Sequence, residues 1–249
     1  MLNVIEHGAS GRPLVIAHGL FGSGRNWGVI AKRLSATRRV ICVDMRNHAG
    51  SFWSDEMTYE AMAADLAEVL EPLGDADLLG HSMGGKASMM AALQGAPMRR
   101  LIVADIAPVT YTHTQTPLID AMEAIDISSV ETRGEADAAL VAQVEDPGIR
   151  AFLLQSLDIK AKAWKLNLNA LRANMNAIIG FPEVAGQCEK PTFFLSGAAS
   201  DYVQPDARPV IKTLFPKARF AKLNGAGHWL HAEKPREFEA AVAAFLAAP

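Results

Sequence analysis

The feature that most constrains this chain is a regular alternation of short apolar runs with helical patterns. The apolar runs lie at residues 13–17, 40–43, 76–80 and 101–104. Runs of this length with few polar residues are typical of strands that are buried on both faces of a sheet. Helical patterns separate them at residues 26–34, 58–70 and 83–93. Strands that alternate with helices predict an α/β protein whose mostly parallel sheet carries helices on both faces.

The alternation stops once, in a segment that shows helical patterns alone. These patterns lie at residues 117–126, 133–144, 147–157 and 167–178. Strand and helix patterns then alternate again, at residues 192–195, 205–214, 219–223 and 235–247. A helical block between two strands of one sheet is an insertion. The sequence therefore predicts a core of residues 1–109 and 183–249, and a helical cap of residues 110–182 that lies over the carboxyl edge of the sheet.

Composition excludes several classes of function. The 249 residues include 24 basic and 27 acidic side chains, and the net charge of −3 leaves no basic field for nucleic acid. Hydrophobic residues make up 50% of the chain, as in folded globular proteins. No apolar run is long enough to span a membrane, and no basic segment followed by an apolar one opens the sequence. We therefore expect a soluble, cytoplasmic protein without stable membrane association, and the sequence leaves its oligomeric state open.

The segment from Gly80 to Gly85 (GHSMGG) has the pattern of a nucleophile elbow. It stands where a predicted strand ends and a predicted helix begins, as this sharp turn requires, and the turn needs glycine two residues before and after the serine. Ser82 is then raised above the sheet edge at the amino end of the helix, where the Met83 amide can stabilise an oxyanion. A tight turn without chemistry is the weaker interpretation, because chance gives roughly 0.07 such patterns in a chain of this composition.

A second glycine-rich loop follows the first buried strand, with the sequence His18-Gly19-Leu20-Phe21-Gly22. Its glycines allow the backbone to approach the elbow closely. We expect the Leu20 amide to be the second oxyanion donor, and the Phe21 amide is the alternative. Taken alone, the segment would equally fit a plain loop, and it is the neighbouring elbow that favours a role in chemistry.

A histidine suited to act as a general base lies after the last predicted strand, in Asn224-Gly225-Ala226-Gly227-His228-Trp229. Small neighbours favour His228, and His231 is its competitor. The spacing of this pair also fits two metal ligands, but no third ligand is placed to complete a site. Cys42 and Cys188 show neither a metal-ligand spacing nor a disulfide framework. We therefore predict no metal and no cofactor.

Together these segments resemble the α/β-hydrolase superfamily and, more narrowly, the YbfF-type bacterial esterases. The narrower resemblance rests on residues 80–86 (GHSMGGK), 105–109 (DIAPV) and 227–235 (GHWLHAEKP). It covers nearly the whole chain and is weakest within the predicted cap. One departure is Ala49, which stands where the family tends to have glycine after the segment Arg46-Asn47-His48. The resemblance implies an α/β-hydrolase fold with an inserted cap, and esterase activity.

The resemblance also implies a catalytic acid between the serine and the histidine in chain order. In the superfamily this acid usually follows the strand predicted at residues 192–195, but here Ser200 occupies that place and Asp201 comes one residue later. Resemblance to the YbfF-like branch implies an aspartate after the strand that follows the elbow helix, which is Asp105 in this chain. We favour Asp105 and keep Asp201 as the alternative. A merely structural Asp105 would anchor the insertion.

These residues predict a serine hydrolase that cleaves carboxylic esters, or acyl thioesters, through an acyl-enzyme intermediate. Ser82 would attack the carbonyl carbon, His228 would transfer protons and Asp105 would orient the histidine. The alternatives are an acyltransferase or a carbon–carbon bond hydrolase of the same fold, or a ligand receptor with a vestigial triad. The partner that all of these share is a small molecule.

Four further residues have a less specific interpretation. Trp229, beside the candidate base, and Met122 and Trp164, in the predicted cap, are candidate substrate-binding residues. Lys86, on the first turn after the elbow, is interpreted either as a solvated helix residue or as a partner of a carboxylate.

Overall fold

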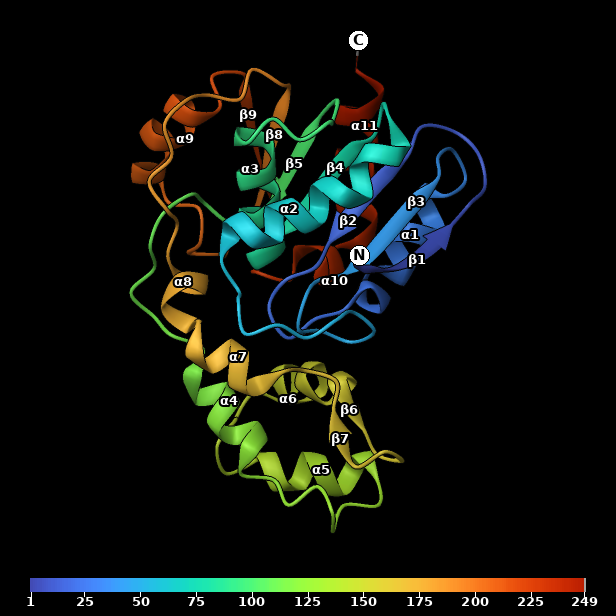
Figure 1. Cartoon of the computed structure of the whole chain (residues 1–249), viewed down its shortest axis with the longest axis vertical. Helices are drawn as coiled ribbons and strands as arrows, with labels where there is room; N and C mark the ends of the chain where they lie inside the picture. Colours follow the sequence, from blue (N-terminus) through green and yellow to red (C-terminus); the bar gives the residue numbers. More distant parts are fainter. Residues whose placement is uncertain (249) are drawn as a thin grey trace.

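The computed structural model describes residues 1–248, and in this part of the chain seven strands form one sheet (Figure 1). They are β1 (Asn3–His7), β2 (Leu14–Ala17), β3 (Val40–Asp44), β4 (Asp77–His81), β5 (Leu101–Ala104), β8 (Thr192–Gly197) and β9 (Ala218–Leu223). The order across the sheet is β1-β3-β2-β4-β5-β8-β9, and β1 with β3 is the antiparallel pair. The other neighbours are parallel, so the predicted mostly parallel sheet is confirmed.

Helices cover both faces of this sheet, because successive residues of its strands point to opposite sides. Val15 and Ile41 belong to the apolar core under α2 (Tyr59–Leu70), α3 (Met83–Leu93) and α9 (Arg208–Leu214). Their neighbours Leu14 and Val40 belong to the core under α1 (Gly28–Leu34), α10 (Leu230–Glu233) and α11 (Pro235–Ala247). Three 3₁₀ turns complete this part: η1 (Gly24–Trp27), η2 (Glu71–Leu73) and η4 (Pro205–Ala207). The two-sided α/β architecture agrees with the prediction.

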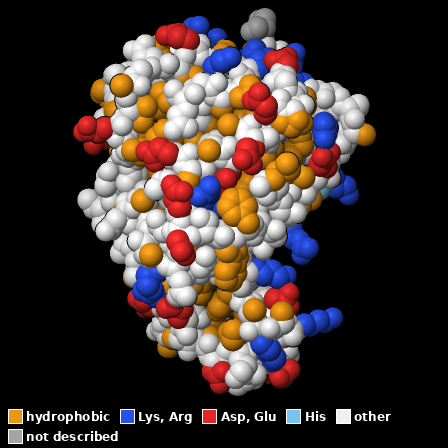
Figure 2. Space-filling view, viewed as in Figure 1, with side chains coloured by type: hydrophobic (Ala, Val, Ile, Leu, Met, Phe, Trp, Pro, Cys, Tyr) orange, Lys and Arg blue, Asp and Glu red, His pale blue; other side chains and the backbone are white. Residues whose placement is uncertain are grey.

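The segment between β5 and β8, for which we keep the name cap (residues 110–182), forms a lobe below the sheet in Figure 1. Its helices are α4 (Thr116–Glu123), α5 (Arg133–Leu140), α6 (Pro147–Leu153), η3 (Leu154–Ser156), α7 (Leu168–Ala173) and α8 (Met175–Ile179). Figure 2 shows hydrophobic side chains that run from the core onto this lobe, with charged ones on either side. In the described residues, no helix combines the length and the apolar character needed to cross a bilayer.

Two expectations for the cap were wrong in detail. It contains an antiparallel hairpin, β6 (Leu157–Asp158) and β7 (Ala163–Trp164), where we expected helices alone. The Asp158 carboxylate accepts hydrogen bonds from the amides of Lys160 and Ala161, a local bond that favours a turn over a helix. The helix predicted at 167–178 is interrupted at Asn174, which separates α7 from α8.

Lys86 joins the cap to the core, and both interpretations made from the sequence were wrong. Its side chain is buried on α3, and Nζ donates hydrogen bonds to the carbonyl oxygens of Ile179 (2.9 Å) and Gly180 (2.5 Å). The ammonium also lies over the rings of Tyr111 and Tyr59, 4.6 and 5.7 Å from their centroids. Carbonyl oxygens at the carboxyl end of α8 attract a cation, so the charge interacts with backbone dipoles and aromatic faces.

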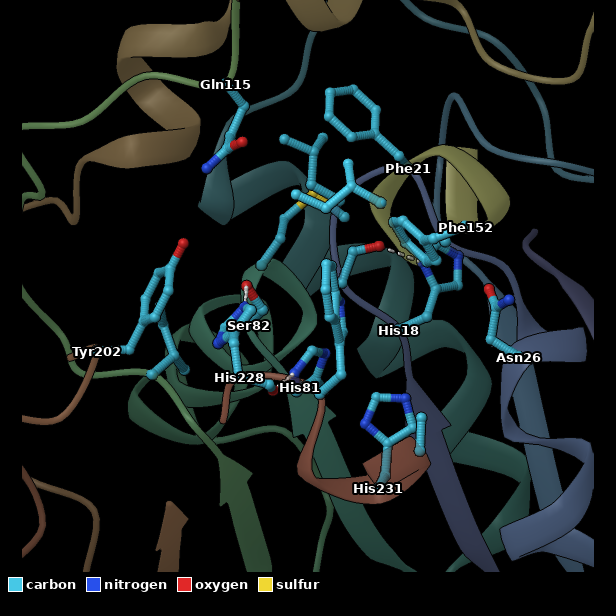
Figure 3. Close-up of a pocket in the computed structure, with 18 of the residues that line it drawn as sticks. His18, Phe21, Asn26, His81, Ser82, Gln115, Phe152, Tyr202, His228 and His231 are labelled. Carbon is cyan, nitrogen blue, oxygen red and sulfur yellow. Dashed lines mark hydrogen bonds between the residues drawn. The ribbon is translucent and has the colours of Figure 1, made fainter. Parts of the chain in front are cut away.

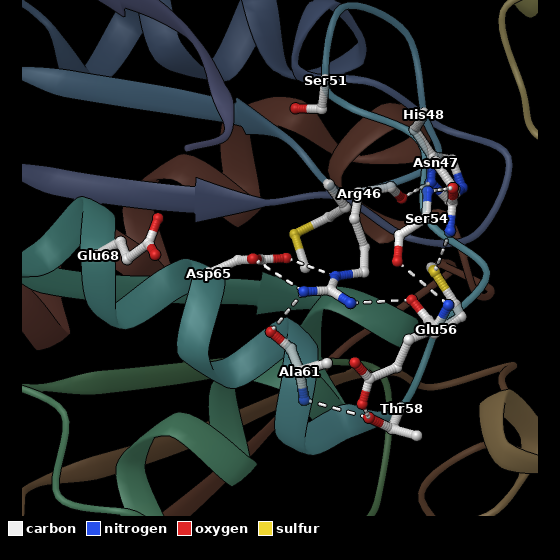
Figure 4. A network of polar contacts seen from close by, with 12 residues as sticks. Arg46, Asn47, His48, Ser51, Ser54, Glu56, Thr58, Ala61, Asp65 and Glu68 are labelled. Atoms are coloured by element: carbon white, nitrogen blue, oxygen red, sulfur yellow. Dashed lines mark hydrogen bonds and ion pairs between the residues drawn. The ribbon is translucent and has the colours of Figure 1, made fainter.

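Arg46, just after β3, anchors its loop to α2 (Figure 4). The guanidinium binds the carboxylate of Asp65 through Nε (2.6 Å) and Nη2 (3.0 Å), and Nη1 donates to the carbonyl oxygen of Glu56 (2.9 Å). Both partners of this ion pair are more than nine-tenths buried. The loop is therefore held by a buried, bidentate ion pair.

We predict that Asp65→Ala lowers the free energy of unfolding by about 3 to 5 kcal/mol, because it leaves the buried Arg46 without its counter-charge. Urea denaturation would measure the change. Glu68→Ala is the matched control on the same helix, since the Glu68 side chain is 61% exposed, and it should change stability by less than about 1 kcal/mol. Equal effects of the two substitutions would contradict the prediction.

Lys86 should make stability depend on pH. Burial lowers the pKa of Lys86 from 10.5 to about 7 in the folded protein. Between these two values the unfolded chain binds more protons than the folded one, so the free energy of unfolding rises with pH across this window. We predict that the stability of the wild type relative to Lys86→Met increases from pH 6.5 to 9.5. Urea denaturation over this range would test it, with the exposed Lys32→Met as control, and parallel curves for wild type and Lys86→Met would contradict it.

Candidate active site

The chain turns sharply between β4 and α3, and Ser82 stands at this turn with φ of 52°. A Cβ atom on Gly80 would lie 2.2 Å from the carbonyl oxygen of Gly84, and one on Gly84 would lie 2.4 Å from that of Ala17. Neither position has room for a side chain, which is the physical reason for the two glycines. The turn leaves Ser82 at the amino end of α3, facing a cavity.

Ser82, His228 and Asp105 form one chain of hydrogen bonds (Figure 3 shows the first two). Ser82 Oγ lies 3.0 Å from His228 Nε2, and His228 Nδ1 lies 2.7 Å from Asp105 Oδ2. The Asp105 side chain is fully buried, whereas that of His228 is 22% exposed. Asp105 Oδ1 also accepts a hydrogen bond from the amide of Gly197 (2.9 Å). In this arrangement Nδ1–H donates to the carboxylate, and Nε2 is free to accept the serine proton.

The alternative acid lies outside this chain of bonds. Asp201 is exposed, and its carboxylate accepts a hydrogen bond from Gln204 Nε2 at 3.3 Å. Ser200, which occupies the usual place of the acid, donates a hydrogen bond from Oγ to Asp105 Oδ2. Asp105 has φ of 52° at the end of β5. Ser200 thus supports the carboxylate that comes from the neighbouring strand, a role that we did not infer from the sequence.

Aromatic rings enclose the imidazole of His228 on two sides. The Tyr202 ring is stacked on it, with 3.9 Å between centroids and 19° between planes, and the His81 ring lies 4.8 Å away. His81 Nε2 donates a hydrogen bond to the carbonyl oxygen of His228 (2.8 Å). Burial lowers the pKa of His81 well below its ordinary value, so this ring is neutral. Both neighbours restrict the orientation of His228, and neither contact had a signal in the sequence.

His231 belongs to a different environment from His228. It is buried and stacked on Trp27, with 4.2 Å between centroids, and burial lowers its pKa to about 3. It makes no hydrogen bond to Ser82 within residues 1–248. The same part of the chain contains no group of three or more histidine, cysteine, aspartate or glutamate side chains that could hold a metal ion. His228 and His231, although three residues apart in the sequence, therefore have different partners: His228 contacts Ser82, and His231 stacks on Trp27.

The two glycine-rich segments bring three candidate oxyanion donors to the cavity: Leu20, Phe21 and Met83. The Phe21 amide already donates a hydrogen bond to His48 Nε2 (3.1 Å). Within residues 1–248, the amides of Leu20 and Met83 donate none, and the first amides of a helix have no intrahelical acceptor. This arrangement favours Leu20 over Phe21 as the partner of Met83.

A cavity of about 670 Å³ lies between the core and the cap, within the usual size of small-molecule sites. Trp229 lines it, together with Phe152 and Leu118 from the cap. Met122 and Trp164 do not, which corrects the prediction for these two residues. Met122 is fully buried in the packing of the cap, and its carbonyl oxygen accepts a hydrogen bond from Trp164 Nε1 (3.1 Å). Helical spacing identifies an apolar face but not the neighbour against which it packs.

Comparisons with known proteins agree with this fold. A model of the alpha/beta hydrolase family matches residues 14–241. The sn-1-specific diacylglycerol lipase ABHD11 of Mus musculus is 40% identical over 98% of this chain and 84% of its own length. The esterase YbfF of Escherichia coli strain K12 is 37% identical over 94% of this chain and 92% of its own length. The solved structure of a marine microorganism esterase superposes with a TM-score of 0.93, at 38% identity and 98% coverage of both chains.

These similarities extend over both the core and the cap, so they are more than a shared motif. The resemblance stated from the elbow, the Asp105 segment and the His228 segment is confirmed at the level of the family. The chain belongs to the alpha/beta hydrolase family.

Proposed function

We propose that this protein is a serine hydrolase of carboxylic esters that works through an acyl-enzyme. The observation that carries the proposal is the chain of hydrogen bonds from Ser82 through His228 to Asp105 at the wall of the cavity. The carboxylesterase class itself agrees with the relatives, which include an esterase of a bacterium and a diacylglycerol lipase of a mouse.

The geometry supports a specific course of reaction. Ser82 Oγ attacks the ester carbonyl carbon while His228 Nε2 accepts its proton, and the carbonyl electron pair moves onto the oxygen. The amides of Leu20 and Met83 stabilise this oxyanion. His228 then donates the proton to the departing alcohol as the carbonyl re-forms, and Asp105 stabilises the positive imidazole throughout. Water repeats the sequence on the acyl-enzyme and releases the acid.

The cavity supports a mostly apolar acyl group. Its wall includes Phe21 from the core and Ile149 and Phe152 from the cap. A thioester presents the same acyl carbon to Ser82 and forms the same kind of oxyanion when attacked. Hydrolysis of acyl thioesters is therefore part of the proposal. In this activity water accepts the acyl group, and the product is the free acid. In acyl transfer an alcohol accepts the acyl group instead, so the product distinguishes the two. Sustained turnover distinguishes it from a receptor that is acylated once.

We predict that Ser82→Ala reduces hydrolysis of aryl esters by at least about a thousandfold and abolishes labelling by a fluorophosphonate, because the covalent route is lost. A series of aryl esters and acyl-CoA thioesters of increasing chain length would identify the preferred substrate. His228→Ala should lose activity to a similar extent, and His231→Ala should retain most of it, since His231 contacts Trp27 and not Ser82. Labelling of the Ser82→Ala protein at another residue would refute the role of the elbow serine.

The acid can be tested by substitution with asparagine, which preserves the shape of the side chain but favours the wrong imidazole tautomer. We predict that Asp105→Asn lowers kcat by several orders of magnitude, compared with about 10⁴ in a serine protease. Asp201→Asn should lower it by less than about tenfold, because its exposed carboxylate does not reach His228. Circular dichroism would show that both variants fold. A larger loss in Asp201→Asn than in Asp105→Asn would overturn the assignment.

A further inference from the structure

Phe21 has a backbone conformation that a phenylalanine seldom adopts. Its φ is 63°, in the left-handed region, and its side chain is buried. The amide of Gly22 donates a hydrogen bond to the carbonyl oxygen of Gly19 (3.0 Å), which closes a turn over Gly19–Gly22. A positive φ at the third residue makes this a type II turn, in which glycine usually occupies that place. Strained residues of this kind persist when their surroundings hold them.

Two hydrogen bonds hold the backbone of Phe21 from opposite sides. Its amide donates to His48 Nε2 (3.1 Å), and His48 belongs to the loop that follows β3. Its carbonyl oxygen accepts a hydrogen bond from Ser156 Oγ (3.0 Å), and Ser156 belongs to η3 of the cap. The same residue is therefore fixed by the core through its amide and by the cap through its carbonyl.

His48 is itself held in the form that can accept this bond. Its Nδ1 donates to the carbonyl oxygen of Arg46 (2.8 Å), so Nε2 carries the lone pair. Burial lowers the pKa of His48 to about 3, which keeps the ring neutral, and the ring is fully buried. Arg46 is in turn bound to Asp65 on α2 (Figure 4). The acceptor for the Phe21 amide is thus rigidly connected to the core.

Ser156 is connected to the same loop from the side of the cap. The amide of Lys165 donates a hydrogen bond to the carbonyl oxygen of Ser156 (2.8 Å). The carbonyl oxygen of Lys165 in turn accepts a hydrogen bond from the amide of Ala49 (2.7 Å), in the loop that follows β3. Asn167 donates two further hydrogen bonds to Asn47, each 3.0 Å long. Its backbone amide bonds to the carbonyl oxygen of Asn47, and its side-chain Nδ2 bonds to Asn47 Oδ1. The hydroxyl of Ser156 is therefore aimed at Phe21 by a backbone that is joined to the core.

The turn that Phe21 completes also orients Leu20. The carbonyl oxygen of Gly19 accepts hydrogen bonds from the amide of Gly22 (3.0 Å) and from His18 Nδ1 (2.8 Å). The Gly19 carbonyl and the Leu20 N–H belong to one trans peptide, in which the two groups point in opposite directions. Because these bonds hold the carbonyl, the Leu20 N–H is left free to face a substrate. If φ of Phe21 relaxed to negative values, the turn would change type and the peptide next to this amide would rotate.

From this geometry we propose that His48 and Ser156 are positioning residues of the oxyanion hole. They hold Phe21 in the left-handed conformation and thereby keep the Leu20 amide where the oxyanion forms. The inference rests on the proposed esterase function, and it adds that the cap contributes to transition-state stabilisation through Ser156 as well as to substrate binding.

The first test is Ser156→Ala, measured as the single-turnover rate of acylation by a saturating aryl ester. Removal of an oxyanion donor costs about 10²–10³ in rate, and a displaced donor costs less, so we expect a loss of about tenfold with little change in substrate affinity. The affinity for a trifluoromethyl ketone, which forms an oxyanion on Ser82, should fall by the same factor. Ser129→Ala is the control, because this cap serine is exposed and its Oγ bonds to the carbonyl oxygen of Asp126 (2.8 Å).

The second test concerns His48. His48→Ala removes the acceptor and should slow acylation by about a hundredfold, the size of effect that a displacement of about 1 Å can cause. His48→Gln places an amide oxygen near the position of Nε2 and should recover most of the rate. If His48→Ala fails to fold, the Ser156→Ala and His48→Gln results decide the question.

The outcomes separate this inference from the proposed function. If a fluorophosphonate does not label Ser82 in the wild type, the proposed function fails. If Ser82 is labelled and Ser156→Ala acylates at the wild-type rate, the positioning role alone is overturned. It is also overturned if the rate falls while the affinity for the trifluoromethyl ketone is unchanged, or if substrate affinity alone falls. Parallel losses in acylation rate and ketone affinity support it.

Discussion

The close packing of the elbow against β2 is the constraint on which the site depends. A Cβ on Gly84 would lie 2.4 Å from the carbonyl oxygens of both Ala17 and His18, so α3 can begin here because residue 84 lacks a side chain. This contact brings the amino end of α3 beside the loop that follows β2. Met83 and Leu20, which come from different segments, therefore line the same cavity. A larger residue at position 84 would separate them.

Backbone strain is concentrated around this contact. Apart from Lys162 in the cap hairpin, the non-glycine residues with positive φ in the described chain are Phe21, Asn47, Ala49, Ser82 and Asp105. Ser82 and Asp105 belong to the proposed triad, Phe21 to the turn over Gly19–Gly22, and the other two to the loop that follows β3. Ala49, with φ of 44°, stands where the family tends to have glycine, and this conformation explains that preference. The strain is maintained by hydrogen bonds from several elements.

Burial gives the histidines of the site different roles. His18, His48, His81 and His231 are buried, and burial lowers the pKa of each, so they act as neutral hydrogen-bonding or stacking groups. His228 is the one of these five that remains partly exposed, at the wall of the cavity and beside a buried carboxylate. A general base needs access to substrate and a partner for its charge, and this position provides both.

The sequence by itself determined the alternation of strands and helices and the elbow with its two glycines. These features are encoded by neighbours in sequence, through side-chain periodicity and local backbone sterics. The family resemblance favoured Asp105 as the acid, but only the tertiary structure shows that Asp105 faces His228 while Asp201 is exposed, that Lys86 binds the end of α8, and that Ser156 reaches Phe21. Each of these contacts joins residues more than 90 positions apart. Such contacts depend on how whole elements pack, and no local pattern records that packing.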